Sequence, residues 1–293
     1  MRNNGWLRGE LTHAHLQVHI YWGRLSWTTP LVLDTQLRTL MAIELAIDDY
    51  NLNDFSEIVR KHQAVRFDYV VTPNADHLIR YHDDRQFRGL YDQASYVLLD
   101  SRFLANLLAV TKGQFARVCR GSDLTSRVLS QVVKPDDRIV LVGTAPAQAQ
   151  ALRVQFGLNH LVHINPRMGF IRDAEAVAAC LSEIEAASPF RFCFLAIGSP
   201  QQEIIAHQLK VRGVARGLAF CNGASIDFLT GAERRAPVWM QWIGLEWLFR
   251  LMRNPKRLAR RYLVRGPRIF LVLPRMRLVL RRVSLSPPII LKS

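Results

Sequence analysis

The sequence lacks the short motifs by which several enzyme classes are recognised. No strand-like run is followed by GxGxxG, and the nearest approach, Gly143-Thr144-Ala145-Pro146, keeps only the first glycine. The patterns GxxxxGK(S/T), GxSxG and HExxH are absent, and so is a DxD triplet of the kind that holds a divalent metal on a nucleotide-sugar diphosphate. These absences argue against dinucleotide-dependent enzymes, P-loop NTPases, hydrolases with a nucleophile elbow and zinc peptidases. A phosphorylated ligand would have to be neutralised by helix N-termini and arginines.

Cysteine and long apolar runs are also scarce. The four cysteines have no CxxC spacing and at least two lie in apolar strand-like runs, which predicts buried free thiols: Cys119, Cys180, Cys193 and Cys221. The first residues, MRNNGWLRGELTHAHL, lack the apolar core of a signal peptide, and no stretch approaches the ~18 uncharged apolar residues that a membrane span requires. We therefore expect a cytoplasmic protein, which can still be attached to a membrane surface.

The positive charge is concentrated at the C-terminal end of the chain. Of the formal net charge of +15, residues 232–293 contribute +13, from 15 Lys/Arg and 2 Asp/Glu, whereas residues 1–231 hold 24 Lys/Arg and 22 Asp/Glu. With 293 residues and 49% hydrophobic content, the chain is long enough for a large core with an appended module. The basic character belongs to the appended part.

From residue 65 onward, strand patterns alternate with helical patterns. Strands are expected over Arg66–Thr72, Ser95–Asp100, Arg138–Gly143, His160–Ile164, Phe192–Ile197 and Gly217–Asn222. Helices are expected over Ala75–Tyr81, Phe103–Val110, Pro146–Phe156, Ala174–Ala187 and from Gln201 onward. Parallel strands need crossover connections, so the pattern predicts an α/β protein with a Rossmann-like, mostly parallel sheet, helices on both faces and a basic helical C-terminal appendage.

Three regions are expected along the chain. Residues 1–62 form an N-terminal helical segment of uncertain role, with a helical pattern between Leu31 and Gln63 and a second short helix near Phe55–His62. Residues 63–231 form the catalytic core. Residues 232–293 form a basic amphipathic appendage that associates with a membrane.

Polar and small residues follow each predicted strand. These segments are Thr72–Asp76, Asp100-Ser101, Gly143-Thr144, Asn165-Pro166, Gly198–Pro200 and Asn222-Gly223. The same residue types are common in ordinary turns, so one such segment alone would indicate little. Six of them at the carboxyl edge of one parallel sheet predict a ligand crevice there.

Six blocks, in the same order along the chain, resemble the WecG/TagA/CpsF glycosyltransferases over roughly Leu52–Phe270. They are TPNADHLIR (Thr72–Arg80), ASYVLLDS (Ala94–Ser101), ARVCRGSDL (Ala116–Leu124), GSPQQE (Gly198–Glu203), NGASIDFLTG (Asn222–Gly231) and RAPVWMQWIGLEWLFRLMRNPKRLARRYL (Arg235–Leu263). Members of that family transfer a sugar from a UDP-sugar to a lipid-linked saccharide, with inversion, during assembly of wall teichoic acid, enterobacterial common antigen or exopolysaccharide. The resemblance implies a hexosyltransferase that uses a UDP-sugar of the N-acetylmannosamine type or UDP-glucose and a polyprenyl-diphosphate-linked saccharide.

The resemblance identifies Asp100 as the catalytic base. An inverting transfer needs a base that takes the proton from the acceptor hydroxyl as that oxygen attacks the anomeric carbon. The family's aspartate at a strand end corresponds to Asp100, although from the residues alone Asp100 could equally cap the following helix. Ser101 follows where family members usually have glycine, so the local turn can differ.

The resemblance also implies contacts to the donor. Thr72 and Asn74 match the family's TPN motif beside the donor sugar or its phosphates, although both are also typical of a strand-to-helix cap. An arginine before Gly-Ser-Asp-Leu, either Arg117 or Arg120, is expected on phosphate. Gln202 matches the glutamine of the family's GxPxQE motif and is expected on sugar or nucleotide.

Three further residues complete the predicted substrate-binding set. Gly143 and Gly198 stand at strand-to-helix turns, where backbone N–H groups can approach a ligand. Glu203 follows Gln202 in the same motif, but an acid in the first turn of a helix is also favoured by the helix dipole.

The C-terminal region combines tryptophans and arginines with almost no acidic residues. Apolar side chains cover nearly all sides of the helix expected after Pro237, so that helix must be buried or lie in an interface. Basic residues interleaved with Phe270–Leu273 and Leu278–Leu280 are typical of a helix that lies on an anionic leaflet. We expect peripheral binding to the inner face of the bacterial cell membrane. The resemblance implies that arginines of this region also contact the diphosphate, for which Arg253, Arg257 and Arg260 are the candidates.

Two other functions stay open. A basic tail with tryptophans can bind RNA, although the Trp and Leu content of Val238–Met252 suits lipid or a protein core better. A degenerate family member could instead act as a scaffold in a polysaccharide assembly complex. We expect no cofactor, no metal requirement and no nucleic-acid partner, and a homo-oligomer is compatible with the sequence.

Overall fold

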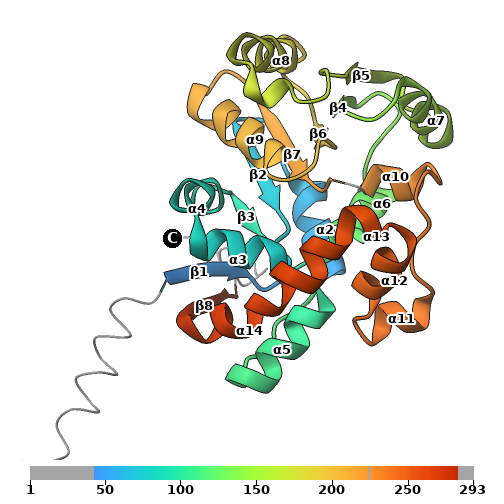
Figure 1. Cartoon of the computed structure of the whole chain (residues 1–293). Helices are drawn as coiled ribbons and strands as arrows, with labels where there is room; N and C mark the ends of the chain where they lie inside the picture. The colour runs from blue at the N-terminus through green and yellow to red at the C-terminus, as the bar shows by residue number, and fades with distance from the viewer. Residues whose placement is uncertain (1–42, 224, 283–293) are drawn as a thin grey trace, which may run out of the picture. The chain divides into compact units, whose positions relative to one another are not determined.

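A computed structural model of the chain describes residues 43–223 and 225–282 (Figure 1). Within this part, six strands form a sheet in the order β3-β2-β7-β6-β4-β5, and every pair of neighbours is parallel. The strands are β2 (Phe67–Val71), β3 (Tyr96–Val97), β4 (Arg138–Val142), β5 (His160–Ile164), β6 (Phe192–Leu195) and β7 (Gly217–Cys221). This confirms the predicted α/β fold with a Rossmann-like parallel sheet.

Helices cover both faces of this sheet, because the strands are apolar on both sides. In β4, Val140 and Val142 face one core, whereas Ile139 and Leu141 face the other. The first core includes side chains of α3 (Ala75–Asp83), α4 (Arg85–Asp92), α5 (Arg102–Lys112), α8 (Ala174–Ala186) and α9 (Gln201–Arg212). The second includes side chains of α2 (Leu52–Lys61), α6 (Gly121–Gln131), α7 (Pro146–Phe156) and α10 (Ser225–Leu229). The short η1 (Phe170–Arg172) precedes α8. All four cysteines are buried free thiols, as predicted.

Two strands from opposite ends of the described region form a separate parallel pair. β1 (Ile43–Asp48) pairs with β8 (Met276–Arg281) over six residues, from Ile43 with Met276 to Asp48 with Arg281. The helical pattern predicted between Leu31 and Gln63 was therefore wrong for β1, while α2 agrees with the short helix predicted near Phe55–His62. The part of that pattern before Ile43 lies outside the described residues. The helix expected around Leu278–Leu280 is likewise a strand.

The reason for these two errors is the length of the segments. In a run as short as β1, apolar residues can match either a helical or an alternating period, and the partner strand decides. Leu45 and Ile47 are buried, and each lies opposite an apolar residue of β8. That partner is more than 200 residues away in the chain, so no local pattern reveals it.

The β1–β8 pair is joined to the main sheet by a carboxylate. Asp48 Oδ2 accepts a hydrogen bond from the backbone N–H of Val97 in β3 at 2.8 Å, and it also lies 3.0 Å from a guanidinium nitrogen of Arg281. Asp49 Oδ2 lies 2.9 Å from Nε of Arg282. The C-terminal strand is thus fixed to the same compact unit as the main sheet.

Short helices between β7 and β8 form the rest of the C-terminal region. They are α11 (Val238–Trp242), α12 (Glu246–Arg253), α13 (Pro255–Ala259), η2 (Arg260–Arg265), η3 (Gly266–Arg268), α14 (Ile269–Val272) and η4 (Leu273–Arg275). The single helix expected after Pro237 is interrupted at Gly244, whose φ is +79°. A Cβ at Gly244 would lie 3.1 Å from the backbone nitrogen of Phe103, so glycine permits the close approach to α5.

Candidate active site

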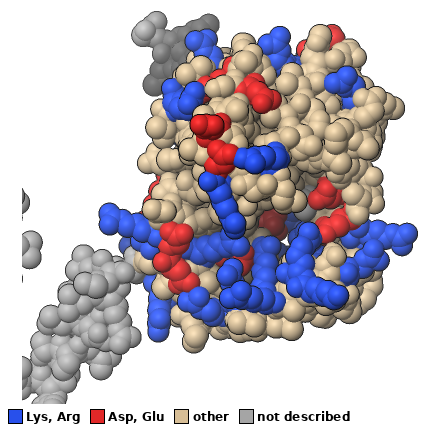
Figure 2. Space-filling view, turned by 45° about the horizontal axis from the view of Figure 1, so that its top comes forward, with Lys and Arg blue, Asp and Glu red and all other residues tan. Residues whose placement is uncertain are grey.

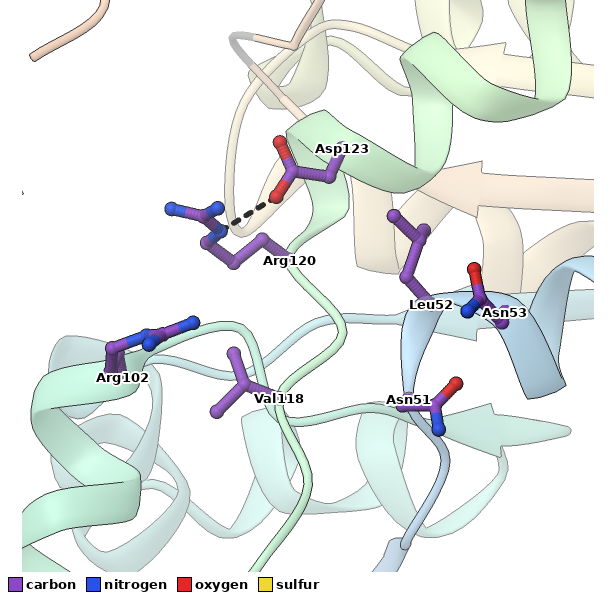
Figure 3. A pocket seen from close by; sticks show the side chains of 7 residues that line it. All are labelled: Asn51, Leu52, Asn53, Arg102, Val118, Arg120 and Asp123. Carbon is purple, nitrogen blue, oxygen red and sulfur yellow. Dashed lines mark hydrogen bonds and ion pairs between the residues drawn. The ribbon is translucent and has the colours of Figure 1, made fainter. Parts of the chain in front are cut away.

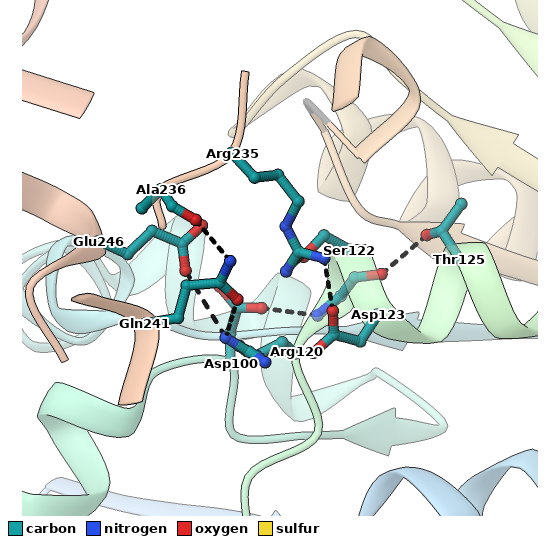
Figure 4. A network of polar contacts seen from close by, with 10 residues as sticks. Asp100, Arg120, Ser122, Asp123, Thr125, Arg235, Ala236, Gln241 and Glu246 are labelled. Carbon is teal, nitrogen blue, oxygen red and sulfur yellow. Dashed lines mark hydrogen bonds and ion pairs between the residues drawn. The ribbon is translucent and has the colours of Figure 1, made fainter. Parts of the chain in front are cut away.

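Asp100 lies at the carboxyl edge of the sheet, three residues after β3. Its backbone N–H donates to the carbonyl of Pro73 at 3.2 Å, which holds the segment after β3 beside the segment after β2. Its Oδ1 accepts a hydrogen bond of 2.6 Å from the backbone N–H of Gly121, the first residue of α6 (Figure 4). The helix dipole favours negative charge at this position. Ser101, and not Asp100, caps α5, because its Oγ accepts from the N–H of Leu104.

The surroundings of Asp100 suit a general base. Burial raises the pKa of its carboxyl to about 6, from an ordinary 3.8; the Gly121 N–H opposes this shift, and the charge of Glu246 adds to it. Arg250 and Arg120 lower the pKa. A carboxylate with this pKa is ionised at pH 7 and is still a better proton acceptor than an ordinary aspartate. Among the described residues, Oδ2 accepts no hydrogen bond, so this oxygen can take a proton.

Arg120 connects this position to the C-terminal region (Figure 4). Its Nε donates to Asp123 Oδ2 at 2.7 Å, and one terminal nitrogen donates to Gln241 Oε1 at 2.8 Å. The same nitrogen lies 3.9 Å from Glu246 Oε2. Gln241 in turn donates to the carbonyl of Ala236 at 2.7 Å. The segment that carries α11 and α12 is therefore bound to the start of α6.

Arg235 and Arg250 add two further guanidinium groups beside this segment. Arg235 lies 2.7 Å from Asp123 Oδ1 and donates to Ser122 Oγ at 3.0 Å (Figure 4). Both guanidinium carbons lie near the ring of Phe228, at 5.9 Å for Arg235 and 5.2 Å for Arg250. Nε of each arginine is buried and has no hydrogen-bond partner among the described residues. Arg250 also lies 3.5 Å from Glu233, so, in the part of the chain that the structure describes, each guanidinium has one acidic partner and one unused Nε donor.

Thr72 and Asn222 contact the start of α6. A Cβ placed on Gly121 would lie 3.0 Å from Thr72 Oγ1 and 3.0 Å from Asn222 Oδ1, so glycine lets the helix begin directly against them. Asn222 Nδ2 donates to Thr125 Oγ1 at 2.7 Å. Its Oδ1 is buried without a partner in the described part of the chain. The ends of β2 and β7 therefore meet the same helix N-terminus as Asp100.

Asn74 has the capping role that its sequence position also allowed. Its Oδ1 accepts from the N–H groups of Asp76 and His77, and a terminal nitrogen of Arg261 lies 3.5 Å away. Nε of Arg261 lies 3.3 Å from Asp76, a buried carboxylate that Arg80 approaches to 3.0 Å. A contact of Asn74 with the donor stays a prediction, for which only the amide nitrogen remains.

Gln202 and Glu203 are buried, and their polar groups are bound to protein. Gln202 Nε2 donates to the carbonyl of Cys221 at 2.9 Å, and its Oε1 accepts from the N–H of Gly223 at 2.9 Å. These bonds attach the start of α9 to the end of β7. Glu203 Oε1 receives hydrogen bonds from Gln202 Nε2 and the hydroxyl of Tyr91, and burial raises the pKa of its carboxyl. Both side chains therefore support the sheet edge, and ligand contact by either stays a prediction.

Gly143 directly follows β4 and Gly198 lies three residues after β6, and both have left-handed conformations, with φ of +91° and +77°. At Gly143, a Cβ would lie 2.9 Å from the carbonyl oxygen of Ala196, so the turn after β4 packs against the end of β6. A Cβ added at Gly198 would have no atom of the described residues within 4 Å. The structure thus explains Gly143 by packing and leaves Gly198 with unobstructed space beside it.

Of the two candidate arginines before Gly121, Arg120 belongs to the surroundings of Asp100. Arg117 points to α2, where a terminal nitrogen lies 2.7 Å from Asp54 Oδ2. The backbone N–H of Arg117 donates to Asp49 Oδ1 at 2.7 Å. A phosphate contact by Arg117 remains a prediction and would require its pair with Asp54 to open.

The predicted arginines of the C-terminal region are exposed, whereas their neighbours reach inward. Arg253, Arg257 and Arg260 are all exposed, and Arg257 lies 3.0 Å from Glu233. Arg250 and Arg261 are half-buried and contact the core. The break between α12 and α13 at Asn254, with φ of −133°, changes which arginines face inward, so helical spacing alone could not select them.

Sequence reasoning missed Arg235, Glu246, Gln241 and the role of Asn222. Two features of the sequence could have indicated them. Arg235 and Glu246 lie within Arg235–Leu263, one of the segments that resemble the family, and Asn222 stands at the end of a predicted strand. Within the described residues, no helix is long and apolar enough to cross a membrane, and no group of three or more His, Cys, Asp or Glu side chains is arranged to hold a metal ion.

Comparison with protein families agrees with the resemblance. The model described as the glycosyl transferase WecG/TagA/CpsF family matches residues 40–283, most of the chain. The match includes β1, the Asp100 segment and the C-terminal region through β8.

Proposed function

Because this chain belongs to the glycosyl transferase WecG/TagA/CpsF family, we propose that it is an inverting hexosyltransferase with Asp100 as its base. The donor is a UDP-sugar, of the N-acetylmannosamine type or UDP-glucose, and the acceptor is a polyprenyl-diphosphate-linked saccharide. The product is an intermediate of a bacterial surface polysaccharide or exopolysaccharide. The observation that carries this proposal is the half-buried carboxyl of Asp100, with a pKa of about 6, at the N-terminus of α6 and near the guanidinium groups of Arg120 and Arg250.

This arrangement supports the following reaction as part of the proposal. An acceptor hydroxyl attacks the anomeric carbon as Asp100 Oδ2 takes its proton, and the bond from the anomeric carbon to the diphosphate oxygen breaks. The new bond forms on the face opposite the departing UDP, which inverts the anomeric centre. Charge that develops on the diphosphate needs fixed donors, and the N–H groups of α6 together with Arg235 and Arg250 are suited to that role.

The donor is proposed to lie beside Thr72 and Asn222. Both side chains adjoin Gly121, and the buried Oδ1 of Asn222 has an acceptor site unused by described protein groups. A sugar hydroxyl would satisfy that oxygen, which otherwise carries a desolvation cost.

A panel of UDP-sugars with a bacterial membrane lipid extract tests the proposal. Wild type should release UDP with at least one sugar in an extract-dependent way, and Asp100→Asn should lose about 100-fold or more of kcat, the usual contribution of a general base. Asp136→Asn, an exposed carboxylate outside the site, is the matched control and should keep full activity. Full activity of Asp100→Asn would remove Asp100 from the mechanism, and no turnover with any sugar would contradict the enzymatic function.

We further propose peripheral binding to the inner face of the cell membrane through the C-terminal region. Figure 2 shows a band of Lys and Arg side chains across the lower half of that view. Exposed apolar side chains of the region include Trp239, Trp242, Ile243, Leu263, Val264, Phe270 and Leu271. Such residues insert among lipid headgroups, and each nearby cation adds on the order of 1 kcal/mol on an anionic surface.

Flotation with anionic vesicles tests this surface by substitution. Truncation would remove β8 from β1, so the double substitution Trp239→Ala/Trp242→Ala is the cleaner change. It should reduce the floated fraction severalfold, whereas Val154→Ala/Val211→Ala, which alters two exposed apolar residues elsewhere, should not. Equal flotation of both variants would exclude α11 as the contact.

A further inference from the structure

The described residues contain a polar hollow near Asp100. A cavity of about 270 Å³ is lined by Asn51, Leu52, Asn53, Arg102, Val118, Arg120 and Asp123 (Figure 3). Sites for whole small molecules are typically about 300–1,000 Å³, so this cavity is suited to a compact head group. It adjoins the catalytic position, because Arg102 is two residues from Asp100 and Arg120 belongs to the surroundings of both.

The charge of the cavity favours an anion. Arg102 and Arg120 lie on one side of it in Figure 3, and the start of α2 lies on the other. The single acidic lining residue, Asp123, is already paired with Arg120 and Arg235, at 2.7 Å each. The first turns of α2 and α6 and the first residue of α5 are among the lining residues, and helix N-termini carry partial positive charge.

In the described part of the chain, the charge of Arg102 has no acidic partner. Within residues 43–223 and 225–282, no carboxylate lies within ion-pair distance of it, and its buried Nε has no hydrogen-bond partner. Its guanidinium carbon lies 5.7 Å from the centre of the Trp242 ring. Such stacking orients a guanidinium but leaves its in-plane donors available to a ligand.

The cavity is continuous with the exposed apolar side chains of the C-terminal region. Trp242, which contacts Arg102, is itself exposed. Phe103, the next residue of α5, lies against Phe270 of α14, with ring centres 6.4 Å apart, and Phe270 is exposed. An occupant with an anionic head in the cavity could therefore extend an apolar chain along α11 and α14.

We infer that this cavity binds the diphosphate of the acceptor, an anionic head group attached to a prenyl chain. The inference rests on the proposed function and deepens it, since it assigns the acceptor a site distinct from that of the donor. Arg102 and Arg120 hold the phosphates, and the chain lies over Trp242. The saccharide attached to the diphosphate then reaches Asp100 from the side of α5, while the donor lies beside Thr72 and Asn222.

Binding of farnesyl diphosphate to the full-length protein tests the inference. The probe has the same head group and a short prenyl chain, and binding can be followed by calorimetry or by the change in tryptophan fluorescence, to which Trp242 contributes as one of six tryptophans. Arg102→Gln should weaken binding by about tenfold or more, because a charge-assisted hydrogen bond is lost. The affinity for UDP should stay within about twofold. Arg102→Lys, which keeps the charge but loses the planar fork, should bind with intermediate affinity.

Arg85→Gln is the matched control. Like Arg102, Arg85 is the first residue of a helix, here α4, and it is exposed. Its substitution should leave farnesyl diphosphate binding unchanged. Thermal melting of each variant verifies folding. In turnover assays, Arg102→Gln should raise the extract concentration that gives half-maximal rate and leave the KM for the UDP-sugar unaltered.

Four results would overturn the inference. Unchanged farnesyl diphosphate binding in Arg102→Gln would show that the cavity is not its site. Loss of UDP affinity in the same variant would assign the cavity to the donor. Inorganic diphosphate binding as tightly as farnesyl diphosphate would show that no prenyl chain is recognised. Failure of the wild type to bind UDP would remove the proposed function and this inference together, whereas UDP binding with no effect of Arg102→Gln would remove only the latter.

Discussion

The pH dependence of transfer is the most direct consequence of the position of Asp100. Its pKa is raised to about 6 by burial, with a further contribution from the negative charge of Glu246. Because the folded-state pKa lies above the ordinary value, the base form is lost as pH falls through about 6, and not near 4. The prediction is therefore tested by varying the pH of the wild-type reaction and then by repeating the pH profile with Glu246→Gln.

The expected size of the effect follows from the pKa. With a pKa of about 6, roughly 91% of Asp100 is ionised at pH 7 and roughly 9% at pH 5, so kcat/KM should fall about tenfold between them. With the ordinary value of 3.8, more than about 90% would remain ionised at pH 5 and the rate would hardly change. Glu246→Gln removes a neighbouring negative charge, so it should lower the pKa of Asp100 and move the acidic limb to lower pH.

The assay is initial-rate release of UDP at limiting donor and fixed lipid extract, in one buffer mixture of constant ionic strength from pH 5 to 8. Glu57→Gln, which neutralises an exposed carboxylate on α2, is the matched control and should leave the limb in place. A rate that is flat between pH 5 and 7 would refute the reasoning about Asp100. An acidic limb that stays at the same pH in Glu246→Gln would refute the contribution of Glu246.

Three further substitutions test the parts of the structure that position the site. Asp49→Ala removes the acceptor of the Arg117 N–H and the partner of Arg282. It should lower the free energy of unfolding by about 2–3 kcal/mol in urea denaturation. A loss below about 0.5 kcal/mol, the level expected for Asp136→Ala, would contradict the role of the Asp49 carboxylate. Gly143→Ala should destabilise the fold by about 1–3 kcal/mol more than Gly157→Ala. Both glycines have positive φ, but of the two only Gly143 would bring its Cβ against a backbone carbonyl, at 2.9 Å. Equal melting temperatures of the two variants would disprove the packing argument. Gln202→Ala leaves the Cys221 carbonyl and the Gly223 N–H without their partner. It should lower the free energy of unfolding by about 2 kcal/mol or more and reduce the affinity for UDP, because the end of β7 shifts. Normal stability with lost UDP affinity would instead indicate a direct ligand contact.

The main sheet was predictable because its signals are local. Each of β2 and β4 to β7 is a short apolar run followed by a turn and a helix, and these features depend on neighbouring residues alone. The strand predicted over Ser95–Asp100 is shorter in the structure, where β3 ends at Val97, but Asp100 lies beyond its carboxyl end, at the predicted edge of the sheet. By contrast, β1 was assigned to a helix because its pairing with β8 depends on residues more than 200 positions away.

The detailed site could not be predicted, because it depends on how separate segments pack. Sequence left Arg117 and Arg120 open, and only the ion pair of Arg117 with Asp54 separates their surroundings. The resemblance implied diphosphate contacts in the C-terminal region, with Arg253, Arg257 and Arg260 as the candidates. In the structure these three are exposed, whereas Arg250 and Arg261 are half-buried. The motif identified Gln202 in the sequence, but its hydrogen bond to the Cys221 carbonyl of β7 forms only in the folded chain.

The sequence by itself determined the α/β class, the strand-end segments that face one edge, the family and the concentration of positive charge in the last 62 residues. Periodicity, turn chemistry and charge are properties of the chain that need no knowledge of distant contacts. The tertiary structure decided which groups surround Asp100 and hence its raised pKa, because desolvation and nearby charge depend on residues brought together from β3, α6 and α12. It also decided that, among the described residues, Arg102 has no acidic partner and lies against the ring of Trp242, which no pattern along the chain could indicate.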